Sequence, residues 1–128
     1  MRITALYAGL LAPLFVVLAV RVIALRRSAR VAVGDGGDRE LQRRMRVQAN
    51  FAEYVAFALL LLALAEGLGS PGWMLHPLGL ALLAGRLSHA WGMSQPREVF
   101  AFRVGGMMAT FAVILLAALL CLWGAVLG

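Results

Sequence analysis

The chain has little of what metal sites and disulfides require. Among its 128 residues it has a single cysteine, Cys121, and two histidines. One cysteine cannot form an internal disulfide, and no second histidine or cysteine lies at a zinc-ligand spacing. Lysine is absent and only six residues are acidic. We therefore expect no metal site, and any charged chemistry must rest on arginine and a few carboxylates.

Polar residues are also scarce. The chain is 62% hydrophobic with a mean hydropathy of +0.87, whereas about half the residues of an ordinary globular domain are apolar. A soluble chain this short could not hide so much apolar surface. We therefore expect one integral membrane domain over residues 1–128, with no separate soluble module. No acidic residue lies between Met1 and Ala32, which argues against a small proton-coupled drug exporter with a carboxylate in its first span.

Four apolar runs predict four transmembrane helices. They cover about residues 3–25, 40–65, 73–93 and 100–127, and each has on the order of the 20 residues that cross a bilayer. The first run ends in arginines and lacks a small-residue cleavage site, so we expect a retained span. Short connections make neighbouring helices antiparallel. The sequence thus predicts an all-α, integral membrane four-helix bundle.

The net charge of +6 comes from twelve arginines. In a soluble protein this would indicate nucleic-acid binding, but here the arginines cluster beside apolar spans, so we expect no nucleic-acid partner. They concentrate in the first and third loops, and the loop between the second and third spans has none. The positive-inside rule then places the first and third loops in the cytoplasm and both termini on the opposite side. Within the first loop, Asp38 is a candidate cap of the second helix.

Polar groups continue from the first loop into the second span. Arg43, Arg46, Asn50 and Glu53 follow one another at spacings of three, four and three, so on a helix they form one stripe. A charged residue in hydrocarbon is costly and normally faces a protein interior, where it pairs or binds a ligand. This stripe is the first candidate site.

Two further spans bring ionisable groups to the same cytoplasmic-side layer. Arg86 and His89 are three residues apart in the third span, and Arg103 begins the fourth. With Glu53 they would form a cavity of net positive charge, which suits a ligand with carboxylates and a thiol that becomes a thiolate.

Structural interpretations stay open for these residues. Glu53 and Arg86 could form a buried ion pair, and His89 alone is more often a hydrogen-bonded core residue. Asn50 could join two helices by a hydrogen bond. Arg43 and Arg44 are favoured as anchors at the membrane interface.

The residues also carry a resemblance to a known family. The segment Arg46–Tyr54 resembles the second-helix pattern Arg-x-x-x-Asn-x-x-Glu of the MAPEG family, the membrane-associated proteins in eicosanoid and glutathione metabolism. The segment Gly85–Ala90 is similar to the Gly-Arg-x-x-His segment of the family's third helix. The four spans and the basic first loop agree, and the chain looks most like short bacterial members. The resemblance thus covers nearly the whole chain and implies a bacterial inner membrane location.

The resemblance implies a homotrimer that binds glutathione as cosubstrate between neighbouring subunits. It further implies that Arg103 stabilises the glutathione thiolate, that Arg86 orients Glu53, and that the thiolate attacks a hydrophobic, lipid-like electrophile. The residues that it places at or near the glutathione are Arg30, Arg46, Gln48, Asn50, Glu53, Tyr54, Arg86 and His89.

Two departures from the family pattern bear on activity. Met93 stands where several catalytic members have a tyrosine near the thiol, and Ala56 replaces a common proline. The loss of the tyrosine puts the chemistry in doubt, and Arg97 is the substitute for Arg103 as the thiolate-stabilising arginine. The first hypothesis is a membrane glutathione transferase or peroxidase. The second is a non-catalytic member of the fold that binds lipid or a partner protein.

Overall fold

The computed structural model describes every residue from Met1 to Gly128 and contains four helices and no strand. The helices are α1 (Arg2–Ala29), α2 (Arg39–Gly67), α3 (Gly72–Ser94) and α4 (Phe100–Leu127). The predicted all-α four-helix bundle is confirmed. α1 continues past the expected end at Leu25, because arginine and alanine are good helix formers even outside an apolar run.

The helix ends explain why the chain turns where it does. α1 ends at Arg30, which adopts a left-handed conformation with φ 56°, a common way to terminate a helix. The Asp38 side chain accepts a hydrogen bond from the Leu41 amide at 3.0 Å, so the predicted cap of α2 is confirmed. Between α2 and α3, Gly69 has φ 93°, a conformation that glycine adopts without strain.

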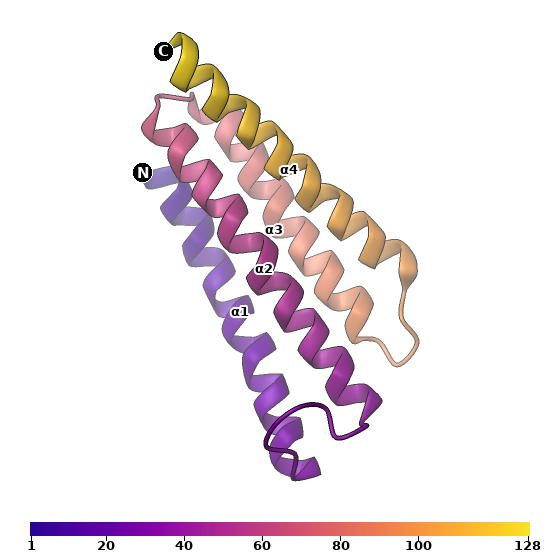
Figure 1. Cartoon of the computed structure of the whole chain (residues 1–128). Coiled ribbons are helices and arrows are strands. Elements are labelled where there is room, and N and C mark those ends of the chain that lie inside the picture. Colours follow the sequence, from indigo (N-terminus) through magenta and orange to yellow (C-terminus); the bar gives the residue numbers. More distant parts are fainter.

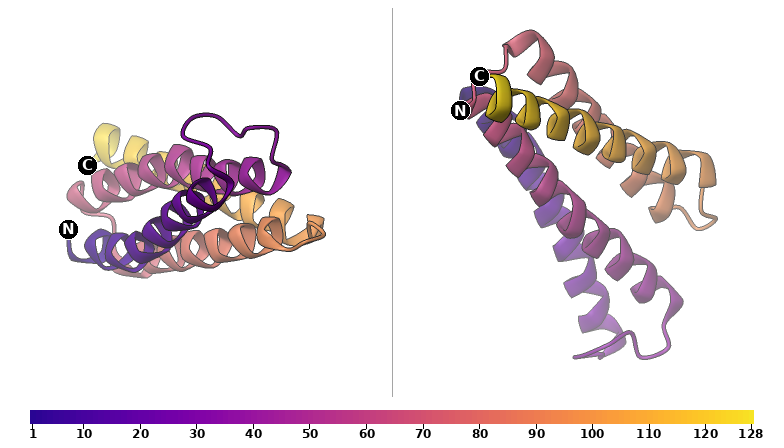
Figure 2. Two further views of the ribbon diagram at one scale, coloured as in Figure 1. Left: turned by 90° about the horizontal axis from the view of Figure 1, so that it is seen from below. Right: turned by 45° about the horizontal axis from the view of Figure 1, so that its top comes forward.

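The helices run up and down in sequence order (Figure 1). Both termini and the α2–α3 turn lie at one end, and the other two connections lie at the opposite end. α2 and α3 each contact all three other helices, whereas α1 and α4 do not contact each other. The α1–α2 pair and the α3–α4 pair converge near the termini and diverge toward the opposite end (Figure 2).

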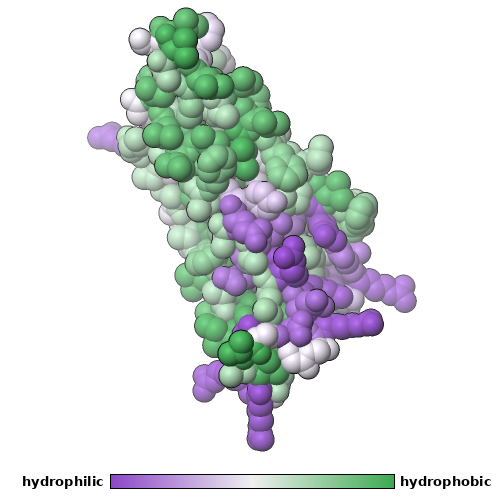
Figure 3. Space-filling view, viewed as in Figure 1, coloured by the Kyte–Doolittle hydropathy of each residue, from purple (hydrophilic) through white to green (hydrophobic).

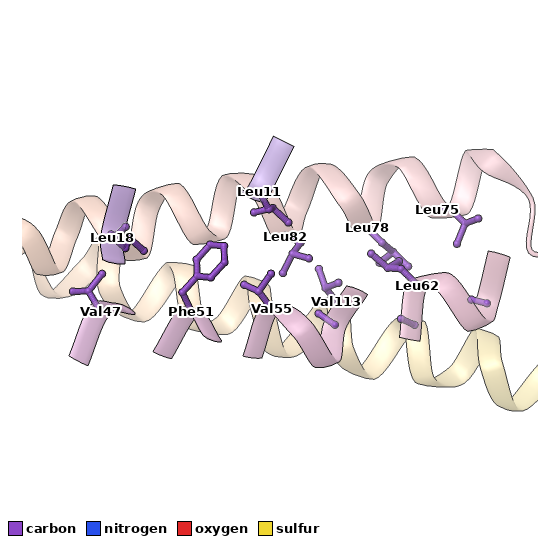
Figure 4. Close-up of a cluster of buried hydrophobic side chains, with 14 of the residues drawn as sticks. Leu11, Leu18, Val47, Phe51, Val55, Leu62, Leu75, Leu78, Leu82 and Val113 are labelled. Carbon is purple, nitrogen blue, oxygen red and sulfur yellow. The ribbon is translucent and has the colours of Figure 1, made fainter. Parts of the chain in front are cut away.

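The core consists of buried apolar side chains from all four helices (Figure 4). Leu11, Phe51, Leu82 and Val113 represent α1, α2, α3 and α4 in it. α3 and α4 approach closely because glycine lies at their contact. A Cβ atom added to Gly106 would lie only 2.7 Å from the Cβ of His89. Small residues that let backbones approach are typical of helix contacts in membranes.

The outside of the molecule is mostly apolar. Only 26 of 128 residues are buried, so most large apolar side chains face outward, and hydrophilic residues gather at the end away from the termini (Figure 3). α1, α2 and α4 are long and apolar enough to cross a membrane. α3 is not among them, and it carries one arginine, two histidines and several glycines. At about 1.5 Å per residue it is still about 35 Å long, and it runs through the bundle in contact with the other three helices.

Candidate functional site

Arg86 is the centre of the polar layer inside the bundle. Its side chain comes from α3 and is 1% exposed. The guanidinium Nη2 donates to Asn50 Oδ1 at 2.7 Å and lies 3.5 Å from His89 Nδ1. The guanidinium carbon is 5.6 Å from the centroid of the Phe51 ring, and Nη1 is 3.5 Å from Met107 Sδ. Three helices thus enclose this cation.

No carboxylate neutralises this buried cation. None of the chain's ion pairs involves Arg86, and its Nε atom is buried without a hydrogen-bond partner. Removing a charge from water costs several kcal/mol, and an attractive interaction must offset this cost. Asn50 and Phe51 offer only a dipole and a ring quadrupole. Arg86 is therefore a buried guanidinium with one unused donor and no anionic partner within the chain.

Glu53 does not pair with Arg86, contrary to one interpretation of the sequence. Arg86 contacts Asn50 and Phe51, and successive α-helical residues are about 100° apart, so Glu53 lies about 60° around α2 from Asn50 and about 160° from Phe51. Glu53 is exposed on the outward side of the helix, and so is Arg46. Both charges lack an ion-pair partner within the chain. The predicted stripe is therefore divided, since Asn50 faces inward and its two charged neighbours face outward.

The two other predicted ligand-binding residues of α2 are partly buried. Gln48 and Tyr54 are half-buried, and neither side chain has a hydrogen-bond partner in the chain. The Tyr54 ring packs edge-on against Phe111 of α4, with the centroids 5.5 Å apart. Tyr54 therefore braces α2 against α4.

His89 and Arg103 lie on the loop side of Arg86. His89 is 1% exposed, next to Gly106. Arg103 begins α4 beside Gly92, where an added Cβ would lie 3.0 Å from the Arg103 amide nitrogen. Three residues separate His89 from Gly92, so Arg103 is about 5 Å further along the axis. The Arg103 guanidinium is 44% exposed and pairs with Glu98 at 2.6 Å, so its charge is partly neutralised.

Arg30 is not brought to the other predicted residues within one chain. The Phe15 ring of α1 lies 5.6 Å from the Phe51 ring, and Phe51 contacts Arg86. Phe15 is therefore at the same height in the bundle as the polar layer around Arg86. Arg30 follows Phe15 by fifteen residues, or about 22 Å along the axis. Arg30 is exposed at the end of the molecule.

Arg43 and Arg44 connect helices at the arginine-rich end of the molecule, which is the end opposite the two termini, where the α1–α2 and α3–α4 connections lie (Figure 1). Arg43 Nη1 donates to the Gln95 carbonyl at 3.0 Å, and Arg44 Nη1 donates to the Arg21 carbonyl at 2.9 Å. These bonds join α2 to the α3–α4 connection and to α1.

The sequence did not reveal several contacts. The carboxylate of Glu66 accepts bonds from the amides of Ile3 and Thr4 at 2.9 and 2.8 Å, and so caps α1 from the end of α2. The Tyr7 hydroxyl lies 2.9 Å from His76 Nδ1. These partners are more than sixty residues apart, so no local pattern pointed to them. The contact between Phe51 and Arg86 had one local indication in the sequence, because Phe51 is an aromatic residue that directly follows the candidate site residue Asn50.

The chain is similar to known membrane proteins. The model of the MAPEG family matches residues 4–123. The "Inner membrane protein YecN" of Escherichia coli K12 is 42% identical over 121 residues, which cover 94% of this chain and 91% of that protein. The protein of the same name from Escherichia coli O6:H1 matches to the same extent.

Proposed function

The chain belongs to the MAPEG family, and from this premise we propose that it binds glutathione in a bacterial inner membrane. We further propose that it activates the glutathione thiol against hydrophobic electrophiles. The arginine-rich connections would then face the cytoplasm, by the positive-inside rule.

The buried Arg86 without a carboxylate partner is the observation that carries this proposal. Glutathione has two carboxylates and one ammonium group, so it can supply the missing anion. Arginine binds carboxylates with two parallel hydrogen bonds, and the unpaired Nε of Arg86 is a free donor for such an arrangement. Asn50 already accepts from Nη2 and retains its amide N–H groups for the peptide carbonyls of the ligand.

The outward charges of α2 support a site completed by a second copy of the chain. A charge at the centre of a membrane helix costs about 2.5–3.5 kcal/mol, yet Arg46 and Glu53 are exposed and unpaired. A neighbouring subunit in a homotrimer would cover them and enclose the ligand between the chains. Glu53 would then bind the ammonium group of glutathione and Arg46 a carboxylate.

Arg103 is the residue proposed to stabilise the thiolate. A free thiol has a pKa of about 8.5, and a nearby guanidinium lowers this pKa so that thiolate is populated at neutral pH. The sulfur would form a bond to an electrophilic carbon, and the electron pair of the bond that breaks would leave with the displaced group. Arg103 must share its guanidinium with Glu98 for this role, because the two pair at 2.6 Å.

Two features favour a non-catalytic member of the family as the second candidate. Met93 is 9% exposed on α3, and its thioether cannot donate a hydrogen bond to a thiolate. The Glu98 carboxylate also reduces the positive potential around Arg103. In this case the protein would bind a lipid or a partner protein and catalyse no reaction.

Calorimetry on the detergent-purified assembly tests ligand binding. We expect glutathione to bind saturably, and we expect Glu53→Gln to weaken binding at least tenfold. Glu40→Gln is the matched control, since Glu40 is on the same helix and pairs only with Arg43 and Arg44 at the arginine-rich end. No binding at millimolar glutathione, or equal affinity in both variants, would refute the proposed site.

Thiolate absorbance in the ultraviolet separates the two candidate functions. A catalytic protein with bound glutathione should show this absorbance at neutral pH and lose it in Arg103→Gln while still binding the tripeptide. Binding without thiolate absorbance in the unaltered protein would favour the non-catalytic function.

A further inference from the structure

One exposed face of α1 changes from apolar to basic along its length. Val16, Val20, Ile23 and Arg27 follow one another at spacings of four, three and four, so they lie in one row on α1, and Arg30 follows at the C-terminal cap of the helix. The three apolar members are 56%, 54% and 54% exposed, and both arginines are exposed. Because α1 is a membrane-crossing candidate, the apolar part of the row faces hydrocarbon and the arginines lie where the helix leaves it.

An open surface cavity of about 390 Å³ lies at the basic end of this row. It is lined by Ile23, Arg26, Arg27, Arg30, Val31 and Ala32. Arg26 is held in place because its Nη1 donates to the Gly34 carbonyl at 2.6 Å. None of the three arginines forms an ion pair with a carboxylate.

The partial negative charge at the C-terminal end of α1 offsets only part of the positive charge of these three arginines. A helix C-terminus carries a partial negative charge of about one half of an elementary charge, and three guanidinium groups surround it. The cavity therefore keeps a clear excess of positive charge at the level of the lipid headgroups. Basic pockets at this depth bind anionic headgroups, and arginine binds phosphate with two parallel hydrogen bonds.

We propose that this row is a binding site for an acidic phospholipid. Arg27 and Arg30 bind the phosphate in the cavity, and an acyl chain lies along Ile23, Val20 and Val16. A free phosphate ion uses only the basic half of the row, whereas a phospholipid uses both halves, which is why the lipid is the favoured ligand. The phosphate end of the row at Arg30 lies about 22 Å along α1 from the level of the Arg86 layer, and the apolar end at Val16 reaches that level.

Native mass spectrometry of the purified assembly, released from nanodiscs of mixed phosphatidylglycerol and phosphatidylcholine, tests this proposal. We expect phosphatidylglycerol to be retained preferentially. An arginine near an anionic headgroup is worth a factor of about five in affinity, so Arg27→Gln combined with Arg30→Gln should reduce retention on the order of twentyfold. Both side chains are exposed and lack carboxylate partners, so the double variant should assemble normally, and the same spectra report the assembly.

Two single variants are matched controls for the change in charge. Arg2→Gln removes an exposed arginine at the other end of α1, and Arg97→Gln removes one from the α3–α4 connection at the arginine-rich end. Both should retain phosphatidylglycerol as the unaltered protein does. Equal retention of the two lipids, or an equal loss in Arg97→Gln and in the double variant, would overturn the proposal. Displacement of the lipid by millimolar inorganic phosphate would instead identify the free anion as the ligand and refute the lipid assignment.

Discussion

Replacing Arg86 by methionine should leave the stability of the unliganded protein almost unchanged, although Arg86 is 1% exposed. Breaking a normal buried charge pair destabilises a protein by about 3–5 kcal/mol. Arg86 has no carboxylate partner, so methionine removes a desolvated charge, and the polar groups that lose a partner are Asn50 and His89. An unsatisfied buried amide costs about 1–3 kcal/mol, and the loss of the desolvated charge offsets this. The net change in the free energy of unfolding should be within about 1 kcal/mol.

A double-mutant cycle with Asn50→Leu makes this reasoning specific. Asn50→Leu alone leaves the Arg86 cation without its 2.7 Å acceptor, and it should destabilise the protein by about 2–4 kcal/mol. The double variant contains neither polar group, and it should be at least as stable as the unaltered protein. All three variants should lose glutathione binding.

Reversible unfolding of the assembly in mixed micelles measures these free energies. Saturating glutathione should stabilise only the unaltered protein, by about 2.7 kcal/mol at one hundred times its dissociation constant. A loss of more than about 3 kcal/mol in Arg86→Met, with no recovery in the double variant, would mean that the Arg86 charge is already neutralised in the folded protein. The idea that the buried cation requires a ligand anion would then be wrong.

Two other substitutions follow from the packing. Gly106→Ala should destabilise the bundle by about 1–3 kcal/mol, because the new Cβ would lie 2.7 Å from the Cβ of His89; Gly105→Ala meets nothing within 4 Å and should be neutral in the same unfolding assay. Glu66→Gln should weaken charge-assisted bonds to the start of α1, with about 1–2 kcal/mol lost, and hydrogen exchange should accelerate at the amides of Ile3 and Thr4; unchanged exchange there would refute the capping role.

The sequence predicted the helices well because each rests on local information. Apolar runs of about 20 residues define the spans, and Asp38 capped α2 as its side-chain chemistry indicated. The predicted end of α1 was wrong by a few residues. The apolar run ends at Leu25, but the following residues favour a helix and α1 continues to Ala29.

The site was predicted less completely because its contacts depend on helix rotation. Spacing showed that Arg46, Asn50 and Glu53 share one side of α2, but a stripe is wide enough to be divided between inside and outside. The structure turns Asn50 toward Arg86 and leaves Glu53 exposed. Which residue meets Arg86 is decided by how α2 packs against α3, and no residue spacing within one helix contains that information.

The cap of α1 has a consequence for the lengths of the first two helices. The first turn of α1 contains no acidic residue, and the carboxylate that satisfies its amides belongs to Glu66, 62 residues after Thr4. The start of one helix is thus joined to the last turn of its antiparallel neighbour. Adding or removing one turn in either helix would move the carboxylate about 5 Å from the amides, so this cap couples the length of α1 to the length of α2.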